Sequence, residues 1–164
     1  MSEQQYQPFL RVGEVIPAFS LPGADGMPHS PWDYKQREHL ILILLTSATT
    51  SEARGLLREF KQRYRELREE ECAVLVLTTD TVVTHLRVQE ELQLPFALLA
   101  DPQGQVIARY TFWNGETRTT LPSIVLANRY GAFYAQWIAQ HEAELPSIDV
   151  LLEDLQYMNK LCTP

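Results

Sequence analysis

The chain has 164 residues, of which 45% are apolar and 21% charged, and its formal net charge is −7 with a pI near 5.1. This length suits one domain across residues 1–164, with residues 1–11 as a possible flexible arm. The acidic balance argues against nucleic acid and against an anionic membrane face as partners, because both need cationic side chains. No apolar stretch approaches the roughly 18 residues of a membrane span, and no secretion signal is recognisable at the start, so we expect a cytoplasmic protein.

The cysteines and histidines give no sign of a metal or disulfide framework. Cys72 and Cys162 are too few for such a framework, and no Cys-x-x-Cys pair is present. We expect the histidines to be solvated or locally hydrogen-bonded, because they lack the spacing of metal ligands. They are His29, His39, His85 and His141. We therefore predict no metal and no cofactor.

The first predicted elements lead up to a buried strand. A short edge strand is expected near residues 9–12, and the Pro- and Gly-rich stretch of residues 13–30 favours extended segments and turns. Residues 39–45, HLILILL, are an unbroken apolar run. Such a run suits an interior strand of a parallel sheet, which is buried on both faces.

A loop and a helix follow this strand. Apolar residues recur at steps of three and four over a predicted helix at about 52–70. Thr49, followed three places on by Glu52, fits a capping box at its start. In open α/β sheets the crevice beyond such a strand is the usual place for chemistry, because helix-start N–H groups point there.

The second half continues the alternation of strands and helices. A second apolar run at residues 73–77 predicts another buried strand, parallel to the first, and Asp80 or Thr81 can cap a helix that Pro95 ends. The remaining predicted elements are a strand at 96–99, turns at 101–104 and 114–115, a short helix at 106–110, strands at 122–127 and 132–138 joined by a turn, and a helix from Ser147. This order predicts an α/β fold, a thioredoxin-like three-layer α/β/α sandwich with a mixed central sheet and an insertion at about 81–112.

With these elements placed, the chain resembles the peroxiredoxin family, the alkyl hydroperoxide reductase / thiol-specific antioxidant group. The likeness extends over residues 12–161. The stretches that carry it are residues 12–22 with Asp25-Gly26, residues 92–101 (LQLPFALLAD) with Tyr110, and the strand–loop–helix of residues 39–60. The resemblance implies an antioxidant oxidoreductase ancestry, a peroxiredoxin-type insertion and a homodimer.

The family's active-site motif, Pro-x-x-x-Thr-x-x-Cys, is incomplete here. The motif's threonine corresponds to Thr50, whereas Thr46 stands at the proline position and Ala53 at that of the peroxidatic cysteine. Peroxide reduction of this type needs a thiolate, which alanine does not have. The resemblance also implies a thiolate-stabilising arginine, for which Arg118 is the nearest candidate, and a cis-proline facing the site, for which Pro122 is the candidate.

Neither cysteine is a strong substitute. Cys72 follows three glutamates and precedes a buried strand, and both features raise a thiol's pKa. Cys162 lies near the C-terminal carboxylate and is similar in placement to the C-terminal resolving cysteine of some peroxiredoxins. We expect both to be structural thiols, with a redox role for Cys162 left open.

These observations lead us to expect a redox-degenerate peroxiredoxin-like protein that acts as a binding or assembly module, with no catalytic residue. We expect a homodimer and leave a further protein partner open. One alternative is an antioxidant thiol oxidoreductase or peroxidase that uses Cys72, Cys162 or a partner's thiol. Another is a small-ligand or anion pocket at Thr50, Ser51 and Arg118. Four large aromatic residues could serve either core packing or an interface: Trp32, Phe112, Trp113 and Trp137.

Overall fold

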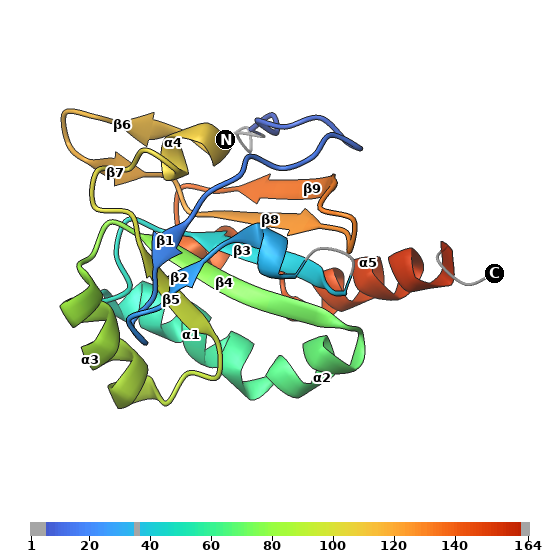
Figure 1. The fold of residues 1–164 in the computed structure, drawn as a ribbon, viewed down its shortest axis with the longest axis horizontal. Coiled ribbons are helices and arrows are strands. Elements are labelled where there is room, and N and C mark those ends of the chain that lie inside the picture. Colours follow the sequence, from blue (N-terminus) through green and yellow to red (C-terminus); the bar gives the residue numbers. More distant parts are fainter. Residues whose placement is uncertain (1–5, 35–36, 162–164) are drawn as a thin grey trace.

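The computed structural model describes residues 6–34 and 37–161. Its central sheet has the strand order β5-β4-β3-β8-β9, with β3, β4 and β5 parallel and β8 and β9 antiparallel to their neighbours (Figure 1). The strands are β3 (His39–Leu44), β4 (Cys72–Thr78), β5 (Ala97–Ala100), β8 (Ser123–Ala127) and β9 (Phe133–Ile138). This confirms the predicted α/β class with a mixed central sheet.

Burial on both faces explains the unbroken apolar runs in β3 and β4. Every residue of these two strands is buried. Alternate β3 side chains enter two different cores, with Ile41 and Ile43 in one and Leu40 and Leu42 in the other. Full burial of such a side chain contributes about 1.5–3 kcal/mol, so a polar replacement at any of residues 40–44 would cost stability.

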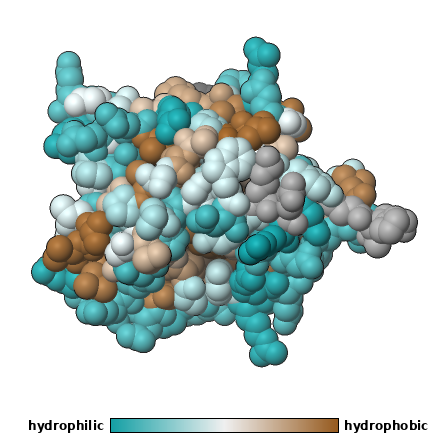
Figure 2. Space-filling view, in the orientation of Figure 1, coloured by the Kyte–Doolittle hydropathy of each residue, from teal (hydrophilic) through white to brown (hydrophobic). Residues whose placement is uncertain are grey.

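Helices cover one face of the sheet. The helices are α1 (Ser51–Gln62), α2 (Tyr64–Glu69), α3 (Val82–Leu92) and α5 (Ile148–Leu161). Apolar side chains of these four helices share the core that contains Ile41 and Ile43. Figure 2 shows a largely hydrophilic surface with an apolar patch over α3, where Val83 and Leu86 are exposed.

The opposite face is covered by the N-terminal segment and by α4 (Ile107–Tyr110). Phe19 and Tyr110 pack edge to face there, with ring centroids 6.1 Å apart. Figure 1 shows α4 and the β6/β7 hairpin on the side of the sheet away from α1, α2 and α3. The smaller elements are β1 (Leu21–Pro22), β2 (Pro28–His29), η1 (Pro31–Asp33), β6 (Trp113–Asn114), β7 (Thr119–Thr120) and η2 (Glu142–Glu144).

The predicted strand at residues 9–12 is not formed. Instead Val15 bridges Ala132 at the edge of the sheet, and the Phe133 N–H donates to the Glu14 carbonyl at 2.7 Å. The preceding segment is held by side chains, since the Phe9 ring packs on Phe112 at a centroid distance of 4.7 Å. The idea that residues 1–11 form a flexible arm stays a prediction.

The single helix predicted at 52–70 is broken at Arg63. That residue leaves helical geometry, with φ −111° and ψ 14°, and separates α1 from α2. Its guanidinium pairs with Glu66 and with Asp149, each at 2.7 Å. Apolar periodicity did not reveal the break, because the apolar stripe continues through it to Leu67.

Two of the four histidines, His39 and His85, are fully buried, so the hydrogen-bonded alternative of the prediction applies to them and not the solvated one. Both are hydrogen-bonded, His39 to Asn159 at 2.7 Å and His85 to Thr78 at 2.6 Å. Among the described residues no three His, Cys, Asp or Glu side chains cluster in a way that could hold a metal ion. No helix within that part of the chain is both long and apolar enough to cross a membrane.

The aromatic residues divide between the two uses left open. Trp137 packs against the core under α1 and α5, and Trp113 against the opposite core. Trp32 and Phe112 remain exposed, at 44% and 41% of their surface. Core packing therefore explains Trp113 and Trp137, and it does not explain Trp32 and Phe112.

Candidate functional site

The loop between β3 and α1 lies where the parallel strands end, and it is tied to the segment before β8. The Thr46 hydroxyl accepts the Thr120 N–H at 2.9 Å and lies 3.2 Å from the Thr120 carbonyl, to which it donates. Leu44 is in register with Ser123, so this link joins the loop to the residues beside Pro122. Thr46 thus has a structural task at the position that the sequence predicts to correspond to the proline of the family motif.

Asp80, which follows β4, anchors the same loop from the other side. Its carboxylate accepts the Ala48 N–H at 2.8 Å and the Ser47 hydroxyl at 2.9 Å. The neighbouring Thr79 hydroxyl donates to the Thr46 carbonyl at 2.8 Å. Sequence reasoning assigned Asp80 only as a helix cap. The adjacency of the two parallel strand ends was the signal that could have indicated its second role.

The start of α1 is capped by Thr50 and not by the predicted Thr49. The Thr50 hydroxyl accepts the Ala53 N–H at 3.1 Å. Thr49 is unavailable because its hydroxyl bonds that of Ser47 at 2.8 Å. Thr50 and Ser51 are both exposed, so the start of α1 faces solvent.

Ala53 lies one turn into α1 and is completely buried. Its methyl group belongs to the apolar core together with Ala48, Leu56 and Leu57. An alanine methyl offers neither a proton nor a lone pair to a reacting oxygen. At this position the helix therefore contributes packing and no nucleophile.

The charged groups around the start of α1 are predominantly acidic. Arg54 pairs with Glu91 at 2.8 Å, and its Nε–H donates to the Thr49 carbonyl at 3.2 Å. Burial raises the pKa of the Glu142 carboxyl, and a hydrogen bond with Glu52 raises it further. The Arg54 guanidinium is thus neutralised by Glu91, and Glu52 and Glu142 place carboxyl groups near the helix start.

Arg118 and Pro122 do not have the geometry expected of them. Arg118 is exposed in the turn between β6 and β7, with a left-handed φ of 56°, and its guanidinium donates to the Pro102 carbonyl. The described contacts do not bring it to Thr50 or Ser51. The predicted cis bond before Pro122 is wrong, because no described peptide bond is cis. Trans is also the intrinsically favoured isomer of an X–Pro bond.

Cys72 lies at the opposite end of the sheet from the loop. It begins β4 beside His39, whereas the loop follows Leu44, which pairs with Leu77. Five residues of strand separate the two ends by roughly 16 Å. Cys72 is fully buried, and burial raises the pKa of its thiol far above the ordinary value. Cys162 lies outside the described residues.

The fold and this loop can now be set against known proteins. The model of the AhpC/TSA family matches residues 12–155. This chain belongs to that family. The peroxiredoxin resemblance and the thioredoxin-like fold predicted from the sequence are therefore confirmed.

Two curated relatives are about 30% identical to this chain or less over the aligned stretch. Peroxiredoxin Bcp of Escherichia coli K12 is 30% identical over 107 residues, which cover 63% of this chain and 66% of that protein. Peroxiredoxin bcp1 of Schizosaccharomyces pombe is 27% identical over 100 residues, 61% of this chain and 51% of that protein. The matched stretch thus spans between half and just under two thirds of these relatives.

Solved structures show the same fold at low identity. The crystal structure of the peroxidoxin BcpB of Mycobacterium tuberculosis superposes with a TM-score of 0.78 at 18% identity, covering 90% of this chain and 97% of that one. The reduced 2-Cys peroxiredoxin of Plasmodium vivax gives 0.79 at 16% identity, covering 91% and 96%. That Ala53 occupies the peroxidatic position stays a prediction from the motif.

Proposed function

We propose that this AhpC/TSA-family protein is a binding or assembly module that has lost peroxidase chemistry at the family's motif. The observation that carries the proposal is Ala53, a buried methyl group at the first turn of α1 where a thiolate would be needed. Neither Thr50 nor Ser51 can replace it, since a hydroxyl does not form a sulfenic acid. We accordingly assign no catalytic residue.

A second candidate is an antioxidant thiol peroxidase, and the names of the relatives favour it over the module. Peroxiredoxin Bcp and Peroxiredoxin bcp1 are both named for this activity. The candidate requires a thiol other than Cys72. Burial keeps the Cys72 thiol protonated, and Cys72 lies at the opposite end of the sheet from the loop. Cys162 or a thiol supplied by a partner would have to serve.

An anion pocket at Thr50, Ser51 and Arg118 has less support. The Arg118 guanidinium is used at the Pro102 carbonyl, and Glu52 adds negative charge at the helix start. The homodimer and the cytoplasmic location remain our proposals from family resemblance and composition. Light scattering after gel filtration would test the dimer.

The deciding experiment is site-resolved mass spectrometry of both cysteines after a small excess of hydrogen peroxide, with the urea-unfolded protein as the reference. For the module we expect each thiol to oxidise no faster in the folded protein than in the unfolded one. The variant Cys162→Ser serves as a matched control, because it isolates Cys72. If Cys162 oxidises orders of magnitude faster in the folded protein, the peroxidase candidate replaces the module.

A further inference from the structure

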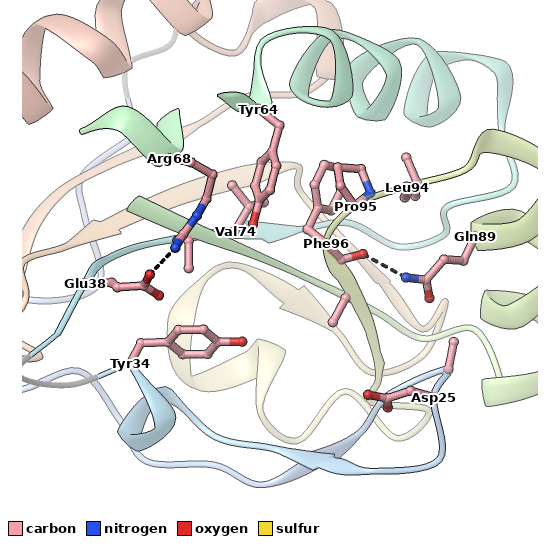
Figure 3. A pocket seen from close by; sticks show the side chains of 13 residues that line it. Asp25, Tyr34, Glu38, Tyr64, Arg68, Val74, Gln89, Leu94, Pro95 and Phe96 are labelled. Atoms are coloured by element: carbon pink, nitrogen blue, oxygen red, sulfur yellow. Dashed lines mark hydrogen bonds and ion pairs between the residues drawn. The ribbon is translucent and has the colours of Figure 1, made fainter. Parts of the chain in front are cut away.

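A cleft of about 480 Å³ lies beside the first residues of β4 and β5, at the end of these strands away from the loop after β3. Figure 3 shows it from close by. Its floor includes Val74 near the start of β4 and Ala97 at the start of β5. Pro95 and Phe96, which precede β5, form one side. This volume falls within the range of small-molecule sites.

Two tyrosine rings form facing walls of the cleft. Tyr34 follows η1 and Tyr64 begins α2, and Figure 3 shows both hydroxyls pointing inward. Both side chains are partly buried, and neither hydroxyl makes a hydrogen bond within the described part of the chain. Tyr64 is held from behind by Phe96, at a centroid distance of 5.5 Å. Burial raises the pKa of both tyrosines, so the rings stay uncharged.

Among the described residues that line the cleft, the charged side chains are those of Asp25, Glu38 and Arg68, two carboxylates and one guanidinium. Arg68 is paired with Glu38, and its other amino group donates to the Cys72 carbonyl at 3.2 Å. Asp25 lies at the opposite end in Figure 3, with 54% of its side chain exposed and a contact of 3.1 Å to His29. An incoming anion would therefore have to displace Glu38 from Arg68. An incoming cation can approach Asp25 and leave the Arg68–Glu38 ion pair intact.

We propose that this cleft binds a small organic cation, an ammonium group attached to an apolar ring. The rings of Tyr34 and Tyr64 border the cleft, and an aromatic ring attracts a cation that reaches its negative face. Val74, Ala97 and Phe96 suit the apolar ring, and Asp25 supplies the opposite charge. The net charge of −7 on the whole chain adds a long-range attraction of the same sign.

The first test compares three probes of similar size by isothermal titration calorimetry: benzyltrimethylammonium, benzyl alcohol and phenylacetate. We expect saturable binding of the ammonium probe, at least about tenfold tighter than either of the others, because only that probe carries a positive charge that the tyrosine rings and the Asp25 carboxylate attract. The proposal is overturned if no probe binds saturably. It is equally overturned if phenylacetate or benzyl alcohol binds as tightly as the cation.

The second test locates the binding with paired variants. Tyr34→Leu keeps an apolar wall but removes the ring, and we expect it to weaken the ammonium probe about fivefold or more. Asp25→Asn keeps the shape of an exposed side chain and removes its charge, and we expect about threefold weakening at low salt. The matched controls Tyr157→Leu and Glu116→Gln alter exposed residues outside the cleft and leave affinity unchanged.

Because Asp25 is exposed, Asp25→Asn keeps the test valid even if Tyr34→Leu fails to fold. Binding that survives both cleft variants unchanged places the cation elsewhere and refutes the proposal. This outcome is independent of the peroxide experiment, since neither Ala53 nor Cys72 is among the described residues that line the cleft.

Discussion

The loop after β3 and the cleft beside β5 use their polar side chains in opposite ways. In the loop, the Thr46 hydroxyl and the Asp80 carboxylate are engaged with backbone groups of neighbouring segments. In the cleft, the Tyr34 and Tyr64 hydroxyls project into open space without such bonds among the described residues. In this loop, which lies in the usual place for chemistry, the Thr46 and Asp80 side chains thus hold backbone segments together. Capacity for a ligand is then better sought where polar groups are unengaged.

The largest expected effect is that of a charge at Ala53, which tests whether this region is packed and closed to solvent. Because Ala53 is fully buried in the core, Ala53→Asp leaves a carboxylate without water or a cation, and we expect a loss of about 3–5 kcal/mol in unfolding free energy. Urea unfolding measures it. The control Ser51→Asp lies in the exposed first turn, where a carboxylate is tolerated or slightly stabilising. Near-normal stability of Ala53→Asp would mean that the position opens to solvent.

Removal of the Asp80 anchor is expected to have the next largest effect. Asp80→Ala leaves the Ala48 N–H and the Ser47 hydroxyl without their acceptor, at a cost of about 1–3 kcal/mol. The free energy of opening that hydrogen exchange measures at the Ala48 amide should fall by the same amount, so the exchange should be faster. Asp80→Asn retains one acceptor oxygen and should give an intermediate loss. Unchanged exchange at Ala48 in Asp80→Ala would show that the loop does not depend on this carboxylate.

His85 beneath the anchor should make stability depend on pH. Burial lowers the pKa of His85, against the opposing effect of Asp80, so the unfolded chain binds a proton where the folded one does not. Stability is therefore fully present above the unfolded pKa of about 6.5 and declines as pH falls below it, by up to about 1.4 kcal/mol per pH unit.

Urea unfolding between pH 7.5 and 5.5 measures this slope. His85→Gln keeps a polar group near Thr78 and should flatten the contribution of this residue. Burial also lowers the pKa of His39. The variant His39→Gln therefore provides the comparison and should remove the separate contribution of His39 to the pH dependence of stability. A slope that neither variant reduces would assign the pH dependence to other groups.

The smallest expected effect concerns Arg118. Its left-handed φ of 56° is strained for a side chain with a Cβ, so Arg118→Gly should change stability by no more than about 1 kcal/mol, with relief of strain offsetting the lost bond to Pro102. The neighbouring control Thr117→Gly has no such strain to relieve and should only destabilise. Thermal unfolding compares the two. A large loss in Arg118→Gly would indicate a greater role for this guanidinium than its exposed turn suggests.

Much of the fold was predictable because its signals are local. The apolar runs at residues 39–45 and 73–77 could only be buried on both sides, and both became interior strands. Helical periodicity likewise located α3 and α5 to within a few residues. The absence of a thiol from residues 46–54 was also evident directly, because it depends on residue identity alone.

Only the tertiary structure decided how distant polar residues meet. The Ser47–Asp80 bond spans 33 positions and the Thr46–Thr120 bond 74, and no local pattern specifies which strand ends become neighbours. The Tyr34–Tyr64 cleft arises in the same way, from η1 and α2 meeting beside β4 and β5. Periodicity reports which face of an element is buried. The partner of a buried or half-buried polar group follows from the packing of the whole chain.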